Sequence, residues 1–207
     1  INRYVPHEYA HRTMEALNCT SCHSGENTLP DISMAGEKLD DGWLAGLFHG
    51  EVLRTRPYQD ARMPAFKSRA DKLAQGIASG AGVETGLEPA PLDPARAEEG
   101  AEIAGMTGYA CTVCHAAGAQ GAIQAFEGQG PNLQLSSERL RDGYYHAWMH
   151  WPQRFIPTTI MPKYTSDKTT ALKPAFYDGD AKKQFTAVKE WMKPLAGAEN
   201  APIGEKH

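Results

Sequence analysis

Two short cysteine motifs constrain this chain more than any other feature of its sequence. Each reads C-x-x-C-H, and together the two motifs use all four cysteines of the 207 residues. Cysteines three positions apart lie on one side of a helical turn, where their sulfurs can reach the two vinyl groups of one porphyrin while the adjacent histidine binds its iron. The pattern is the attachment signature of c-type haem. We therefore predict two covalently attached haem c groups, bound at Cys19, Cys22 and His23, and at Cys111, Cys114 and His115.

A zinc site, a thioredoxin-like redox pair and a disulfide framework are the competing interpretations of the same cysteines. Paired cysteines in zinc ribbons are typically separated by about 15 to 20 residues, whereas these two pairs lie 92 positions apart. A thioredoxin-like pair requires a βαβ context, and both motifs are instead surrounded by Gly-rich loops and helical stretches. A disulfide framework does not require a histidine directly after each pair. Haem is the interpretation that uses every residue of both motifs.

Two of the seven methionines are followed by proline at comparable distances after the haem motifs. Met63 lies 40 positions after His23, and Met161 lies 46 positions after His115. A residue before proline is biased toward extended conformations, so each methionine should lie on a loop, from which its thioether can reach a haem face. Ligation by Met and His is an established arrangement in cytochromes c, and Met raises the reduction potential. We predict Met63 and Met161 as the second iron ligands.

Two histidines form the alternative ligand set. His49 and His150 occupy matching positions in the two halves of the chain, and they would make bis-His haems of lower potential. Each lies in a helix-like stretch before the Met-Pro loop, so we favour the methionines. Replacement of a methionine by one of these histidines stays open at this stage.

Part of the sequence is repeated within the chain, which indicates two domains. Aligning Pro30 with Pro131, an offset of 101 positions, superposes a series of identical or similar residues. The superposed pairs are Asp31 and Asn132, Ile32 and Leu133, Glu37 and Glu138, Leu39 and Leu140, Asp41 and Asp142, Gly42 and Gly143, Trp43 and Tyr144, and His49 and His150. The stretch between the copies is rich in Gly and Pro, as linkers are. We predict a first domain over 1–80, a linker over 81–94 and a second domain over 95–207.

The pattern within each predicted domain is helical. An Asp-Pro start and a high Ala and Glu content predict a helix over 95–106, leading into the second haem motif, with 8–17 as its counterpart in the first domain. Asp180 can cap a closing helix whose apolar face we expect to pack on the helix over 95–106. A shorter helix over 69–77 closes the first domain. Since alternating β patterns are lacking, we predict an all-α fold with long loops.

The composition excludes several classes of function. A formal net charge of -4 with 22% charged residues provides no basic surface for nucleic acid. The apolar stretches are far shorter than the ~20 residues of a membrane helix, so we expect no membrane span in this chain. The sequence begins at Ile1, and residues 1–10 lack the basic and apolar regions of a signal peptide. We interpret it as a mature or excised chain.

The order of these features resembles the tandem class I cytochrome c proteins of bacteria. Each half contains a helix, the C-x-x-C-H motif, a Pro-containing loop, a middle helix, a Met-Pro loop and a closing helix. Residues 148–162 are similar to the Met loops of cytochrome c domains fused to larger bacterial oxidoreductases, whereas the Gly-rich insert over 116–130 departs from the simplest members. The resemblance implies two domains, each wrapped around one haem. It also implies assembly in the periplasm or otherwise outside the cytoplasm, and docking of an exposed haem edge onto redox proteins.

Ligands on both faces of each iron predict an electron carrier without a catalytic site of its own. A six-coordinate iron has no vacancy for a substrate, so it cycles between its ferrous and ferric states. Two alternatives remain. A two-haem peroxidase would carry the same motifs, with one haem left open or opened on activation. The chain could also be the electron-accepting module of a larger dehydrogenase or reductase, with the other domains or subunits of that enzyme as its partners.

Overall fold

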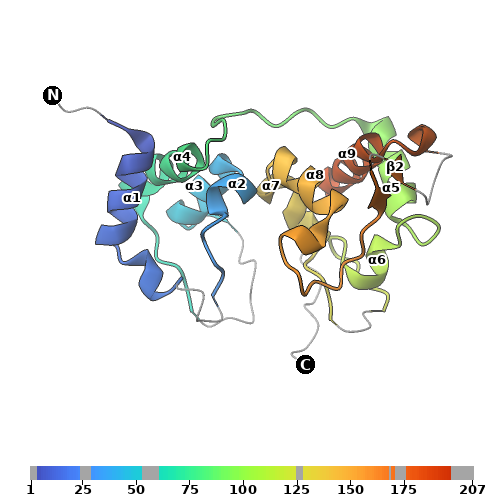
Figure 1. Cartoon of the computed structure of the whole chain (residues 1–207), viewed down its shortest axis with the longest axis horizontal. Helices are drawn as coiled ribbons and strands as arrows, with labels where there is room; N and C mark the ends of the chain where they lie inside the picture. Colours follow the sequence, from blue (N-terminus) through green and yellow to red (C-terminus); the bar gives the residue numbers. More distant parts are fainter. Residues whose placement is uncertain are drawn as a thin grey trace. The chain divides into compact units, whose positions relative to one another are not determined.

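The structure divides the chain into two compact units, Ile1–Pro89 and Ala90–His207. It is a computed structural model, and it describes residues 4–23, 29–52, 61–124, 128–167, 169–170 and 176–196. The division between the units falls inside the Gly- and Pro-rich stretch 81–94. Helices dominate both units, and strand is scarce (Figure 1).

Short helices joined by long loops make up each unit. In the first unit they are α1 Pro6–Ala16, η1 Cys19–Ser21, α2 Ala35–Lys38, α3 Asp41–His49, η2 Lys67–Arg69 and α4 Ala70–Gly80. In the second unit they are α5 Pro94–Ala104, α6 Cys111–Cys114, η3 Leu133–Leu135, α7 Ser136–Arg139, α8 Asp142–His150, η4 Pro152–Arg154, η5 Tyr177–Gly179, α9 Ala181–Met192 and η6 Lys193–Leu195. The helices expected over 8–17, 69–77, 95–106 and after Asp180 are therefore confirmed, with ends shifted by a few residues.

The described residues are mostly helical, as expected for an all-α chain, and the second unit adds one short stretch of strand. Thr165–Ser166 (β1) and Thr169–Thr170 (β2) form a two-residue antiparallel pair. The chain reverses there through Asp167, whose φ of 57° is left-handed, a conformation that Asp tolerates better than most residues. A hairpin of this size leaves no alternating pattern long enough to be read from the sequence.

The sequence repeat is also a repeat of structure. α2 and α7 each contain four residues, α3 and α8 each contain nine, and both pairs are related by the same offset of 101 positions. Asp40 caps α3 by accepting a 3.1 Å hydrogen bond from the backbone N–H of Trp43. Arg141 at the equivalent position of α8 makes no side-chain cap. The two copies thus share their path although their capping chemistry differs.

A close helix crossing organises each unit: α1 packs on α4, and α5 packs on α9 (Figure 1). Glycines allow both approaches. A Cβ atom at Gly76 of α4 would overlap the carbonyl oxygen of Pro6, and one at Gly100 of α5 would overlap the carbonyl oxygen of Ala187. The predicted packing of the closing helix on the helix before the second C-x-x-C-H motif is confirmed.

Each unit has its own apolar core beside its helix crossing. The first core is small and contains Ala10, Leu44, Phe48, Ala70, Leu73 and Ala74. The second is larger and contains Ile103, Ala104, Tyr109, Cys111, Tyr145, Met149, Ala181, Phe185, Ala187, Val188 and Met192. A cysteine of the second C-x-x-C-H motif, Cys111, therefore belongs to the second core. Among the residues that the structure describes, no helix is long and apolar enough to cross a bilayer.

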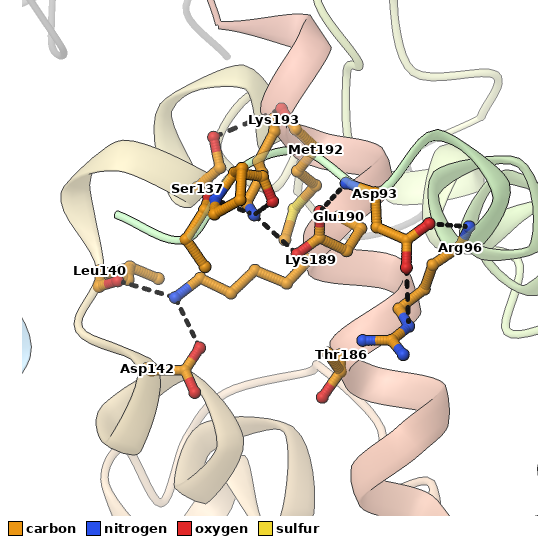
Figure 2. A network of polar contacts seen from close by, with 12 residues as sticks. Asp93, Arg96, Ser137, Leu140, Asp142, Thr186, Lys189, Glu190, Met192 and Lys193 are labelled. Atoms are coloured by element: carbon orange, nitrogen blue, oxygen red, sulfur yellow. Dashed lines mark hydrogen bonds and ion pairs between the residues drawn. The ribbon is translucent and has the colours of Figure 1, made fainter. Parts of the chain in front are cut away.

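Polar contacts fix α9 to the rest of the second unit (Figure 2). The ammonium of Lys189 donates to the carbonyl oxygen of Leu140 at 3.3 Å and to Asp142 Oδ1 at 2.9 Å. The neighbouring Glu190 accepts a 3.2 Å hydrogen bond from the backbone N–H of Asp93, at the start of α5. Since Asp142 begins α8 and Asp93 caps α5, α9 is linked through side chains to the start of both helices.

Candidate functional site

The two C-x-x-C-H motifs adopt the same local geometry. The residue before each motif is left-handed, with φ 52° at Asn18 and φ 55° at Ala110. One helical turn follows, and it closes when the histidine N–H donates to the carbonyl oxygen of the first cysteine, at 3.0 Å for His23 and 2.9 Å for His115. A left-handed alanine costs roughly 1–2 kcal/mol. Such strain is typical of functional sites.

A proline carbonyl orients the imidazole of each motif. His23 Nδ1 lies 2.7 Å from the carbonyl oxygen of Pro30, and His115 Nδ1 lies 2.8 Å from the carbonyl oxygen of Pro131. A carbonyl can only accept, so Nδ1 carries the proton, and the lone pair for a metal is left on Nε2. Metal-ligating histidines are usually oriented in this way by a hydrogen bond from their other nitrogen.

The imidazole of His115 is also packed against the backbone. A Cβ atom on Gly130 would overlap its ring, and the N–H of Gly130 donates to the carbonyl oxygen of Cys114 at 2.8 Å. Burial lowers the pKa of His115 and outweighs the opposing effect of the hydrogen bond to Pro131. The ring is therefore neutral at pH 7, as a ligand for iron must be.

None of the four cysteines forms a disulfide in the structure. Burial raises the pKa of Cys111 to about 12, and it also raises the pKa of Cys19. Reactive cysteines of thioredoxin-like pairs have lowered pKa values, whereas raised values are typical of unreactive buried thiols. The raised pKa values of Cys19 and Cys111 are thus unlike those of a reactive thioredoxin-like cysteine.

Met63 and Met161 both lie on loops, as their position before proline predicts. Met161 packs against the core cluster that contains Cys111, and its sulfur accepts a 3.0 Å hydrogen bond from Trp148 Nε1. Met63 is 40% exposed and is not part of the first unit's core cluster. The structure thus brings the predicted ligand of the second site onto the same core as its motif, and places that of the first site at the surface.

The two histidines of the alternative ligand set make other contacts. His49 Nε2 lies 3.1 Å from Asp71 Oδ1. The ring of His150 packs edge-on against Phe185, with centroids 5.2 Å apart. Burial, followed by the charge of Lys163, lowers the pKa of His150. The contact with Asp71 thus engages Nε2 of His49, and the contact with Phe185 places the ring of His150 against the second core.

Sequence reasoning missed the proline carbonyls, Gly130 and the hydrogen bond from Trp148 to the sulfur of Met161. The repeat pairs Pro30 with Pro131, which was a signal for the carbonyls, but no sequence pattern shows which imidazole a carbonyl will meet. In the part of the chain that the structure describes, no group of three or more His, Cys, Asp or Glu could hold a metal ion. No protein-family model, no curated protein and no solved structure matches the chain.

Proposed function

We propose that this chain is a two-haem c-type cytochrome, which transfers electrons one at a time between redox proteins. The observation that carries the proposal is the pair of hydrogen bonds between the motif histidines and the carbonyls of Pro30 and Pro131. Both motifs present an imidazole with Nδ1 protonated and Nε2 available, in the same turn geometry. This is the arrangement that an iron ligand requires.

The residues of each motif fit a covalently attached haem. The two cysteines of each motif lie on one helical turn, from which their thiols would form thioether bonds with one porphyrin. His23 and His115 would hold the iron through nitrogen, and Met63 and Met161 would hold it through sulfur. A bound haem supplies one-electron chemistry between ferrous and ferric states. The protein's part is to keep both ligands in place in both states and to shield the group from water.

The resemblance to tandem class I cytochromes extends the proposal to class I domains, to assembly in the periplasm or otherwise outside the cytoplasm, and to redox proteins as donor and acceptor. No catalytic residue is assigned.

The test is to express the chain with haem c maturation and to measure what it carries. We expect two porphyrins per chain that survive denaturation, and optical and paramagnetic resonance spectra of six-coordinate low-spin iron with His and Met ligands. A redox titration should show two one-electron steps. A chain without covalently attached porphyrin would refute the proposal. A five-coordinate haem together with turnover of peroxide would replace it with a two-haem peroxidase.

A further inference from the structure

Met161 is held at three of its atoms. Its sulfur accepts a hydrogen bond from Trp148 Nε1 at 3.0 Å, and its carbonyl oxygen accepts one from Gln153 Nε2 at 2.7 Å. Its backbone N–H donates to Thr159 Oγ1 at 3.3 Å. Both the loop and the thioether are therefore fixed in orientation.

Aromatic neighbours hold the indole of Trp148 in place. Tyr144, one turn earlier on α8, stacks near it with ring centroids 6.3 Å apart and planes at 21°. Phe155, just after η4, lies on it at 6.1 Å and 34°. Tyr144 and Phe155 also contact each other, at 5.0 Å. The N–H donor of Trp148 thus comes from a packed cluster and has little freedom to turn away from the sulfur.

The first copy of the repeat differs at the position of the indole donor. At the offset of 101 positions, which relates α3 to α8, Trp148 corresponds to Leu47. Leucine has no side-chain hydrogen to donate. The residue that donates to Met161 is thus replaced by an apolar side chain at the equivalent position of α3.

We propose that Trp148 positions the sulfur of Met161 and that its hydrogen bond gives the haem of the second unit the higher reduction potential. This inference rests on the proposed function. A hydrogen bond draws electron density from the sulfur, which then donates less to iron. Ferric iron depends on that donation more than ferrous iron does, so the ferrous state is favoured. Hydrogen bonds around the ligands are a recognised means by which proteins tune haem potentials.

Replacing the indole by a ring without a donor tests the inference in the full haem-loaded chain. In Trp148→Phe we expect the ratio of ferrous to ferric second haem at a fixed potential to fall about tenfold, which corresponds to about 59 mV for a one-electron couple. The first haem should be unchanged. Trp151→Phe is the matched control, because Trp151 is 51% exposed and its ring lies under the ammonium of Lys163, at 5.0 Å. It should leave both midpoints in place.

The optical spectrum distinguishes a role of Trp148 in positioning the sulfur from a role in packing alone. The optical band of sulfur bound to ferric iron should persist in Trp148→Phe but shift, whereas a purely structural defect would abolish it. A variant that keeps this band with an unchanged midpoint would overturn the inference while leaving the proposed function intact. Absence of covalent haem in the unaltered chain would instead overturn both.

Two methionine variants show which haem has the higher midpoint potential, and this test does not depend on the folding of Trp148→Phe. Met161→Ala should shift the higher midpoint, and Met63→Ala should shift the lower one. If the higher midpoint moves in Met63→Ala, the inference is wrong.

Discussion

The second imidazole site depends on a residue without a Cβ atom. Gly130 lies directly against the ring of His115, so that any Cβ there would overlap it. The neighbouring residue, Pro131, provides the carbonyl that holds Nδ1. The ring is therefore fixed by the backbone on one side and by a hydrogen bond at its edge. Only a glycine can supply the first of these contacts without displacing the second.

Gly130→Ala should therefore damage the second site selectively. We expect the added methyl to push the imidazole from its position, to lower the stability of the second unit by about 1–3 kcal/mol and to reduce covalent haem to less than two per chain. Gly128→Ala is the control, because a Cβ atom there meets nothing within 4 Å. Haem content and thermal melting measure the effect, and full loading of both variants would contradict the expectation.

The stability of the second unit should depend on pH through the ionisation of Asp142. Partial burial favours the neutral carboxyl of Asp142, but the hydrogen bond and charge of Lys189 outweigh it and lower the pKa of Asp142 below 3.8. Because the pKa of Asp142 is lower in the folded chain than in the unfolded chain, its negative charge stabilises the fold at any pH above the unfolded-state pKa of Asp142. This stabilisation is lost as the pH falls through the folded-state pKa. Because the side chain is 72% exposed, water screens the pair, and the contribution is less than about 1 kcal/mol.

The measurement is the unfolding midpoint of the haem-loaded chain between pH 7 and the acid range. We expect the difference between the unaltered chain and Asp142→Asn to be constant above about pH 5 and to vanish well below pH 4. A difference that grows on acidification would show that the sign of the Asp142 contribution is wrong.

At the scale of elements, a helix crossing closes each unit, and glycine lets the helices touch. In the first unit the glycine belongs to the later helix, α4, and in the second it belongs to the earlier helix, α5. In both, the atom that a Cβ would meet is a backbone carbonyl oxygen, which cannot move aside by changing rotamer. Both units therefore have a glycine where the two helices touch, but on different members of the helix pair.

Alanine at either crossing should destabilise the unit that contains it. For Gly76→Ala and Gly100→Ala we expect losses of about 1–3 kcal/mol, because overlap with the backbone exceeds the gain in helix propensity. Gly80→Ala is the control within α4, since its nearest contact would be the Cβ of His7 at an ordinary 3.7 Å. Chemical unfolding measures all three, and equal stability of the crossing variants and the control would contradict the role of close approach.

At the scale of the whole molecule, each unit contains a complete set of candidate ligands. The first unit holds Cys19, Cys22, His23 and Met63, and the second holds Cys111, Cys114, His115 and Met161. No ligand of one site has to be borrowed from the other unit. The electronic properties of each site should therefore respond to substitutions in its own unit.

Methionine substitutions test this independence. Met63→Ala and Met161→Ala should each lower the midpoint of one haem by on the order of 0.1 V, within the roughly 0.8 V that axial ligands control, and leave the other nearly unchanged. Met106→Ala is the control, because Met106 is 61% exposed and no role is assigned to it. Redox titration provides the measurement, and an unchanged pair of midpoints in both variants would refute the ligand assignment.

The sequence by itself determined the features that depend on near neighbours. Spacing within C-x-x-C-H, the proline after each methionine and the capping Asp180 act over a few residues, so the helical turn at each motif, the two Met loops and the start of α9 were predictable. The repeat predicted that α2 and α3 recur as α7 and α8. The short β pair at Thr165–Ser166 was missed because two residues carry no period.

Only the tertiary structure decided which distant groups meet. The carbonyl of Pro131 reaches His115, Gly130 lies against the same ring, and Trp148 donates to the sulfur of Met161 across a loop. These contacts depend on the path of the chain between the partners, and many paths are compatible with the same local preferences. Residue identity therefore specifies what chemistry is available, while packing selects which donor faces which acceptor.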